Sequence, residues 1–160
     1  MFIFEVATGK YHEVIIERVI SRDYFRIRKE RYFFNWLDFS QYDVYKIRRK
    51  DDTDILGVMA LIDFDYDKRI QIKLLAASKE NTRKNKQYDR IAGILIAFAC
   101  MKTLEKYGRR GGVSLVPKGW LIDHYIENYG MVWAGLELSL EFETRDEITN
   151  KYILWKPTKY

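Results

Sequence analysis

The sequence predicts an α/β fold of the α+β kind, built around a mixed and mostly antiparallel central sheet. Three strand-like runs follow one another over residues 43–77 with only short polar turns between them, as in an antiparallel meander. Residues 91–107 are apolar on nearly every side, which predicts a helix buried against that sheet. A length of 160 residues with 48% hydrophobic content favours one domain, residues 1–160, with one sizeable core.

The first forty residues predict one strand and two helices. Residues 1–7 (MFIFEVA) have the composition of a short strand, and Gly9 is the break that follows it. Residues 11–25 (YHEVIIERVISRDYF) place apolar side chains at helical spacing, which predicts an amphipathic helix. A second helix is predicted around residues 31–39 (RYFFNWLDF).

The meander strands are predicted at residues 43–49, 54–62 and 69–77. The third strand alternates apolar and polar side chains from Ile70 to Leu74, which is the period of a strand with one face more buried than the other. The chain then leaves the sheet through a basic loop.

The C-terminal half predicts alternating helices and strands. Gly108 stands where the helix over residues 91–107 needs a C-cap. The elements expected after it are a strand at 111–117, a helix at 121–129 ended by Gly130, and two strands at 136–143 and 150–156.

Composition narrows the classes of function. The net charge of +5 favours anionic partners, but nucleic acid, a phosphorylated cofactor and an acidic surface remain open. No apolar run reaches the roughly 18 residues that span a bilayer, and no signal-peptide pattern occurs, so we expect a cytoplasmic protein without a membrane partner. Cys100 is expected to be a buried thiol. His12 and His124 lack carboxylate or thiol neighbours at ligand spacing, so no metal site is expected.

The loop before the buried helix reads KQYDRIAG, residues 86–93. A helix N-terminus offers unpaired N–H groups and a positive dipole end, which together bind anions. Basic side chains lie close by in the sequence, namely Arg83, Lys84, Lys86 and Arg90. This pattern predicts a phosphate site, and the alternative is a solvated turn before a core helix.

The order of elements and this loop resemble the GNAT superfamily of acetyl-CoA-dependent N-acetyltransferases. That family marks its acyl-CoA site with Gln or Arg, two residues, Gly, one residue, then Gly or Ala, and residues 87–92 fall in register with Arg90 at the glycine position. Residues 121–131 (LIDHYIENYGM) resemble the family's penultimate helix, and Gly57 resembles the glycine of its third strand. The resemblance covers most of the chain from Asp43 onward, and the first forty residues match by element order alone.

The resemblance implies a sheet of six to seven strands with helices on both faces, and acetyl-CoA as co-substrate without a metal. The backbone around Leu74 to Ala76 would line the pantetheine and donate an N–H group to the oxyanion. Arg90 would either clamp the pyrophosphate or crowd it. The implied cofactor-binding residues are Leu74, Leu75, Ala76, Arg83, Lys84, Gln87, Tyr88, Asp89, Arg90, Ile91, Ala92 and Gly93.

The implied reaction is direct attack of a neutral amine on the thioester. Tyr125 takes the family's general-acid position and would protonate the departing thiolate, although its place on an apolar stripe also suits a core tyrosine. Glu80 is the candidate general base, alongside acidic residues of the turn 63–67, and a water relay is the alternative. The acceptor amine is not specified by the sequence.

A function of another class stays open beside this one. A catalytically silent GNAT-like module would bind CoA poorly and act as an interaction or nucleic-acid-binding domain, and Arg90 at the glycine position favours it. Residues 24–36 (YFRIRKERYFFNW) interleave arginines with aromatics, which suits base stacking, an acceptor groove, or aromatics packed inward. Nucleic acid is otherwise expected only through the acceptor, and the chain is expected as a monomer or homodimer.

Overall fold

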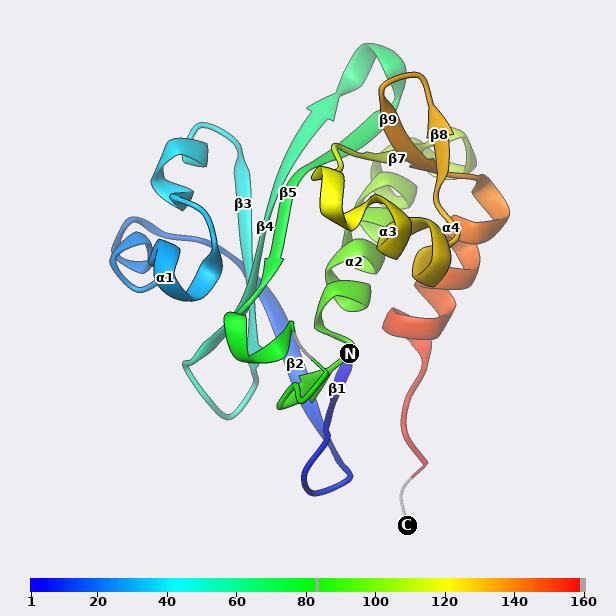
Figure 1. Ribbon diagram of the computed structural model, residues 1–160. Helices are drawn as coiled ribbons and strands as arrows, with labels where there is room; N and C mark the ends of the chain where they lie inside the picture. The colour runs from blue at the N-terminus through cyan, green and yellow to red at the C-terminus, as the bar shows by residue number, and fades with distance from the viewer. Residues whose placement is uncertain (83, 159–160) are drawn as a thin grey trace.

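The computed structural model describes residues 1–82 and 84–158, which form a nine-stranded sheet with helices on both faces (Figure 1). The strand order is β6, β1, β2, β3, β4, β5, β7, β9, β8, and of the neighbouring pairs in this part of the chain only β5 and β7 run parallel. The strands are β1 Phe2–Glu5, β2 Lys10–Arg18, β3 Asp43–Arg49, β4 Ile55–Phe64, β5 Arg69–Ala77, β6 Tyr88–Asp89, β7 Gly112–Leu115, β8 Val132–Ala134 and β9 Glu137–Leu140. The helices are α1 Lys29–Tyr32, α2 Ile91–Tyr107, α3 Ile122–Tyr129 and α4 Phe142–Thr149, with a π-helical turn at Asn150–Leu154.

Two hydrophobic cores lie on opposite faces of the sheet. The larger one packs α2, α3 and α4 against the strands, and Ile94 and Ile96 of α2 are fully buried in it. The smaller one lies under α1, where Tyr32 and Trp36 cover Leu74 and its neighbours on β4 and β5. Figure 1 shows α1 on one side and the other three helices on the other. The predicted fold class is therefore confirmed, with helices on both faces of a mostly antiparallel sheet.

The predicted strand count of six to seven is wrong, because the sheet has nine strands in the described residues. Six of the predicted strands form. The strand predicted at 150–156 does not form, and β2, β6 and β8 come in addition. Two of these additions are only two and three residues long, which is too short to give a sequence pattern.

The helix predicted over residues 11–25 is wrong in its first half, which forms β2. Gly9 has φ +69°, a left-handed conformation that suits glycine, and the turn it makes folds β2 back onto β1. The branched side chains from Val14 to Ile16 also favour a strand. Residues Ser21–Phe25 form a 3-10 turn, and the helix predicted at 31–39 is split into α1 and a second 3-10 turn at Trp36–Phe39.

The C-terminal end departs most from the prediction. Gly135 has φ +69° and turns β8 into β9, so the strand predicted at 136–143 ends at Leu140. The strand predicted at 150–156 is wrong, because the chain continues from α4 into the π-helical turn. Ile148 and Tyr152 are buried there in the larger core, so tertiary packing on α2 decides the conformation of this segment.

The middle of the chain follows the prediction closely. The meander of β3, β4 and β5 is confirmed, as is the helix over 91–107, which ends at Gly108 with φ +65°. The pairing of β4 with β5 shifts by one residue, since Ala60 faces Leu74 while Leu61 faces Ile72. Lys73 is the extra residue of this bulge, and bulges bend the strand that carries them. No helix in the described residues is long and apolar enough to cross a membrane.

Candidate functional site

The parallel pair of β5 and β7 opens at the bulge. Its pairing runs from Arg69 opposite Gly112 to Ile72 opposite Leu115, and one further bond joins Val116 N–H to Ile72 O at 3.1 Å. In the described residues no β7 partner continues beyond this point, while β5 continues to Ala77 along β4. The last residues of β5 therefore leave one edge free of β7.

The backbone of β5 presents N–H groups to this free edge. Ser78 donates its N–H to Leu56 O of the β4 side at 2.8 Å. Successive N–H groups of a strand alternate between its two edges, so those of Leu75 and Ala77 point away from β4 and toward the opening. Leu75 lies within the stretch, Leu74 to Ala76, whose backbone the resemblance implies as the oxyanion donor. Of the three residues in that stretch, only Leu75 directs its N–H toward the opening, so Leu75 is the candidate donor.

Tyr125 of α3 reaches the opening from the side of the larger core. A small cavity of about 10 Å³ lies there, and it is lined by Ile72, Leu74, Leu75, Leu115, Lys118 and Tyr125, with further apolar side chains of the loop before α3. Tyr125 is 6% exposed, and no hydrogen bond of its hydroxyl is found in the described part of the chain. Burial raises the pKa of Tyr125 to about 12, so its phenol stays protonated at neutral pH.

The loop from Ser78 to Arg90 is fixed to the sheet through its own polar groups. Asn81, which is buried, accepts the N–H of Tyr88 at 2.7 Å and donates to Ser78 Oγ at 2.8 Å. Gln87 accepts the N–H of Val6 at 3.0 Å, after which β6 pairs with β1. The backbone of Tyr88 and Asp89 is therefore part of the sheet, and the first turn of α2 follows directly.

Arg90 has a backbone conformation that favours glycine. It has φ +80°, in the left-handed region, and it caps α2. Its N–H is accepted by the carboxylate of Asp89 at 2.7 Å, and the same oxygen accepts from Lys86 at 2.6 Å. Burial raises the pKa of Asp89, but the hydrogen bonds from Lys86 and the Arg90 backbone, together with the charges of these two residues, make the net shift downward. A carboxylate therefore stands at the start of α2.

The side chain of Arg90 turns away from the opening. Its Nε–H donates to Phe2 O at 3.0 Å and its Nη2–H donates to Lys151 O at 2.7 Å. Arg90 is absent from the lining of the cavity beside Tyr125. The side chain therefore leaves the space between β5 and β7 open.

Glycines allow close contacts on both sides of the start of α2. A Cβ built at Gly57 of β4 would lie 2.9 Å from Cγ2 of Ile91 and 3.1 Å from Ala76 O, so Gly57 lets the first residue of α2 approach the sheet. A Cβ built at Gly93 would lie 2.3 Å from two ring carbons of Tyr152. Tyr152 therefore packs directly on the first turn of α2.

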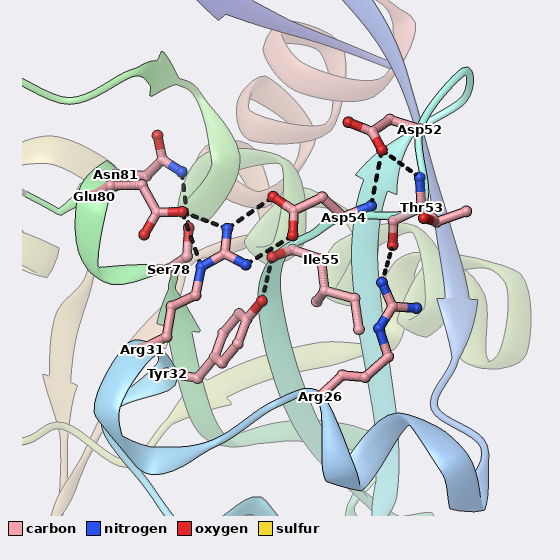
Figure 2. A network of polar contacts seen from close by, with 10 residues as sticks. All are labelled: Arg26, Arg31, Tyr32, Asp52, Thr53, Asp54, Ile55, Ser78, Glu80 and Asn81. Carbon is pink, nitrogen blue, oxygen red and sulfur yellow. Dashed lines mark hydrogen bonds and ion pairs between the residues drawn. The ribbon is translucent and has the colours of Figure 1, made fainter.

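Glu80 lies in a network of charges at the end of β5 (Figure 2). Arg31 of α1 donates to both carboxylate oxygens of Asp54 at 2.7 Å and to Glu80 at 2.5 and 3.0 Å. Burial raises the pKa of Glu80, but the hydrogen bond and charge of Arg31, together with the hydrogen bonds from the Glu80 backbone and from Ser78, hold the pKa below its usual value. The carboxylate borders an open groove of about 400 Å³ between α1 and the residues after β5, whose lining is Glu30, Arg31, Lys79 and Glu80.

The structure brings together only some of the residues that the sequence predicts. Tyr125 and the Leu74 to Leu75 stretch line one cavity, whereas Glu80 lines a different hollow. Ile91, Ala92 and Gly93 open α2, while Lys84 and the side chain of Gln87 are exposed. Arg83 lies outside the described residues. The sequence does not predict the contacts of Tyr152, Trp155 and Arg31, because these contacts join distant segments.

The strip at residues 24–36 is divided by burial. Tyr32 and Trp36 are buried, and Tyr32 donates to Ile55 O at 2.6 Å. Phe25 and Phe33 are exposed, as are Arg26 and the cations beside it. The interpretation that aromatics of this strip pack inward therefore holds for Tyr32 and Trp36. In the described chain no three potential metal ligands gather into one group.

No model of a protein family matches this chain, and no curated protein sequence does. Solved structures match it by shape. AtaTR bound with acetyl-CoA matches with a TM-score of 0.58 at 12% identity, over 85% of this chain and 98% of that one. Mutant forms of the spermidine/spermine N-acetyltransferase SpeG from Vibrio cholerae match with 0.58 at 10%, over 84% and 97%.

A third structure carries the family name itself. A GNAT family acetyltransferase from Elizabethkingia anophelis with acetyl-CoA bound matches with a TM-score of 0.51 at 15% identity, over 81% of this chain and 98% of that one. At such low identity the likeness concerns the fold alone. The chain has the fold of the GNAT acetyltransferases, in a divergent form.

Proposed function

We propose that the protein is an acetyl-CoA-dependent N-acetyltransferase that passes the acetyl group directly to a primary amine. The observation that carries this proposal is the parting of β5 from β7 after Ile72 and Leu115, with Tyr125 lining the space that results. The free edge of β5 supplies backbone N–H groups on one side of that space, and a phenol supplies a proton donor on the other.

The cofactor would lie along the free edge of β5 and end at α2. Pantetheine amides would pair with the backbone of Leu75 and Ala77 in the manner of an added strand. The diphosphate would meet the first N–H groups of α2, at Ile91, Ala92 and Gly93, which have no earlier carbonyl of the helix to bond. Lys86, together with Lys84, would add positive charge worth about 1 kcal/mol or less each.

The chemistry moves one acyl group and one proton. The nitrogen lone pair of the neutral amine attacks the thioester carbon, a C–N bond forms, and the C–S bond breaks with its electron pair going to sulfur. The N–H of Leu75 would bond the oxyanion that develops. Tyr125 would donate its proton to the departing sulfur, and the proton lost by the new ammonium would return to Tyr125 through solvent. Burial makes Tyr125 a weaker acid than an exposed tyrosine and keeps it protonated.

Glu80 stays the proposed base with less support. Its carboxylate is ionised at neutral pH, but the pairing with Arg31 that lowers its pKa also weakens it as a base. It also lines a hollow separate from the cavity at Tyr125. Its role would therefore be to accept the ammonium proton through water, and a water relay to bulk solvent would serve without it.

One observation favours the alternative of a catalytically silent module. The carboxylate of Asp89 already accepts the N–H of Arg90, which is the amide at the family's glycine position. A diphosphate brought to this helix start would meet that negative charge. The silent module would keep the fold and bind CoA poorly, with the exposed residues of the 24–36 strip available to another macromolecule.

Calorimetric titration with acetyl-CoA and with CoA tests the proposal. We expect binding, and at a hundredfold excess over the dissociation constant a gain of about 2.7 kcal/mol in the free energy of unfolding. Free-thiol release is then measured with a polyamine, an aminoglycoside, a peptide with a free N-terminus and an aminoacyl-tRNA. Absence of binding at millimolar cofactor would overturn the proposal in favour of the silent module, and binding without thiol release would leave the acceptor to be found.

A further inference from the structure

Arg90 joins three parts of the chain that are far apart in sequence. Its guanidinium bonds Phe2 O of β1, 88 residues away, and Lys151 O of the π-helical turn, 61 residues away. Its own backbone caps α2. One side chain therefore links the first strand, the start of α2 and the C-terminal segment.

Two aromatic rings complete the environment of the guanidinium. Its central carbon lies 4.9 Å from the ring centroid of Tyr152 and 4.7 Å from that of Trp155. Trp155 packs in turn on Tyr11 of β2, with ring centroids 5.1 Å apart. In the described residues no carboxylate lies within ion-pair distance of Arg90. The charge is therefore held by two carbonyl oxygens and two π faces, an arrangement that a lysine does not reproduce.

The backbone of Arg90 shows that this link costs conformational energy. A residue with a Cβ at φ +80° is strained by about 1 kcal/mol or more, and such strain persists where the surroundings hold it in place. A glycine would take this conformation without strain. The contacts of the side chain are what distinguish arginine from glycine at this position.

The segment that Arg90 holds covers the first turn of α2. Tyr152 packs on Gly93 and lies 6.5 Å from Tyr129 between ring centroids. Trp155 N–H bonds Asn150 O at 3.0 Å, which closes the segment on itself. The N–H groups proposed to bind the diphosphate therefore border this segment.

We propose that Arg90 is a positioning residue, which fastens residues 150–155 across the start of α2 and so builds one wall of the acetyl-CoA site. The fastening is a statement about the ligand-free protein, and the wall rests on the proposed function. The contacts of the Arg90 side chain hold this wall in place, and a glycine, which has no side chain, would leave it unattached. Loss of these contacts would free the C-terminal segment while leaving the sheet and α2 in place.

Hydrogen exchange of the full chain without ligand tests the fastening. The variants are Arg90→Gly, which relieves the strained φ, Arg90→Lys, which keeps the charge, and Trp155→Ala. We expect amide exchange over residues 150–155 to rise by about tenfold or more in all three, with α2 and β5 unchanged. The control is Lys151→Ala, which keeps the backbone carbonyl that Arg90 bonds and should exchange as the wild type does. Equal exchange in Arg90→Gly and the wild type would overturn the fastening.

Titration with acetyl-CoA tests the wall. We expect the dissociation constant to rise about tenfold in Arg90→Gly and Arg90→Lys and to stay unchanged in Lys151→Ala. An unchanged constant in a variant whose segment exchanges faster would overturn the wall and leave the fastening intact. A wild type that does not bind acetyl-CoA would remove the wall together with the proposed function, and the exchange measurement would still decide the fastening. Rescue of affinity by Arg90→Lys would assign the effect to charge and overturn the positioning role.

Discussion

The ring of Tyr152 lies directly against Gly93, so that a Cβ added to this glycine would stand 2.3 Å from two ring carbons and 2.8 Å from the hydroxyl oxygen. The contact joins the first turn of α2 to the π-helical turn that follows α4. Gly93 is the third residue of α2, and glycine in a helix is less favourable than alanine by up to about 1 kcal/mol. The space it leaves for Tyr152 is therefore the reason for glycine here.

Gly93→Ala should lower the free energy of unfolding by about 1 to 3 kcal/mol. The new methyl group must displace the buried ring of Tyr152, and this costs more free energy than the higher helix propensity of alanine contributes. Urea denaturation measures this. The control is Gly119→Ala, whose Cβ would meet nothing within 4 Å and should change stability by about 0.5 kcal/mol or less. The double variant with Tyr152→Leu should recover part of the loss. A Gly93→Ala protein as stable as the wild type would show that Tyr152 moves aside freely.

The sequence predicts well where local pattern and tertiary position agree. The three meander strands and α2 show continuous periodic or apolar runs, and Gly108 ends α2 as expected. The C-terminal segment around Tyr152 has the aromatic and branched side chains that favour a strand, yet Tyr152 packs on Gly93 of another element. No window of sequence contains that contact. The helix predicted where β2 forms is wrong for a related reason, because Val14 and its neighbours fit helical and strand spacing alike.

The candidate site follows the same division. The choice of Tyr125 and of the start of α2 comes from motif spacing; in the structure Tyr125 lines the cavity at the opening and α2 begins at Ile91, while their roles stay proposals. The two partners of the Arg90 side chain could not be predicted from motif spacing, because Phe2 and Lys151 accept through backbone carbonyls, which every residue has. The pKa of Glu80 could not be predicted from spacing either, because it depends on Arg31, which lies 49 residues away in the segment predicted as the helix over 31–39.

Arg31→Ala should destabilise the protein at neutral pH by about 1 kcal/mol, a modest value because the three side chains are each more than a third exposed. The hydrogen bond from Arg31 is the main cause of the lowered pKa of Asp54, and at Glu80 it is the largest of the contributions that together overcome burial and lower the pKa. Carboxylates with lowered pKa values stabilise the fold above their unfolded pKa, and this stability is lost as the pH falls through their folded pKa. The difference from the wild type should therefore shrink in acid.

Urea denaturation at neutral and acidic pH measures that difference. Arg28→Ala is the matched control, because Arg28 is exposed and donates only to Phe25 O at 3.2 Å within the described chain. A difference that stays constant from neutral pH into acid would contradict the assignment of the pKa shifts to Arg31.

Tyr125→Phe should lower kcat by about a hundredfold while changing the dissociation constant of acetyl-CoA by about twofold or less, because the phenol acts on the departing sulfur. The stability should hardly change, since no partner of the hydroxyl is found in the described residues. Tyr66→Phe, at an 84% exposed position, is the control. An unchanged kcat would remove Tyr125 from the mechanism.

The pH dependence follows from the burial of Tyr125. With a folded pKa of about 12 and an ordinary value of 10.0, the phenol stays protonated across the range where an exposed tyrosine ionises. Activity should therefore show no loss near the ordinary tyrosine pKa. The unfolded chain releases this proton first, so stability should fall as the pH rises from the ordinary value toward the folded one. A decline of kcat centred on the ordinary value would contradict the buried placement.

Asp89→Asn should bind acetyl-CoA more tightly than the wild type. The carboxylate of Asp89 accepts the N–H of Arg90 and pairs with Lys86 at the start of α2, where a diphosphate would need both groups. Asparagine keeps an acceptor for the N–H, removes the negative charge and frees Lys86. The dissociation constant should fall by about threefold to tenfold, and the gain should shrink with added salt. Loss of a carboxylate at a helix N-terminus should also cost the fold about 0.3 to 1 kcal/mol.

Two variants separate this local effect from net charge. Glu105→Gln makes the same change of charge at the exposed far end of α2 and should leave the dissociation constant unchanged. Lys86→Ala removes the cation that neutralises Asp89 and should weaken binding. If Asp89→Asn binds acetyl-CoA no better than Glu105→Gln does, the diphosphate lies elsewhere than at the first turn of α2. Tighter binding in Asp89→Asn alone would place the phosphates beside Arg90, because only a ligand within a few ångströms distinguishes two equal changes of charge on one helix at moderate salt.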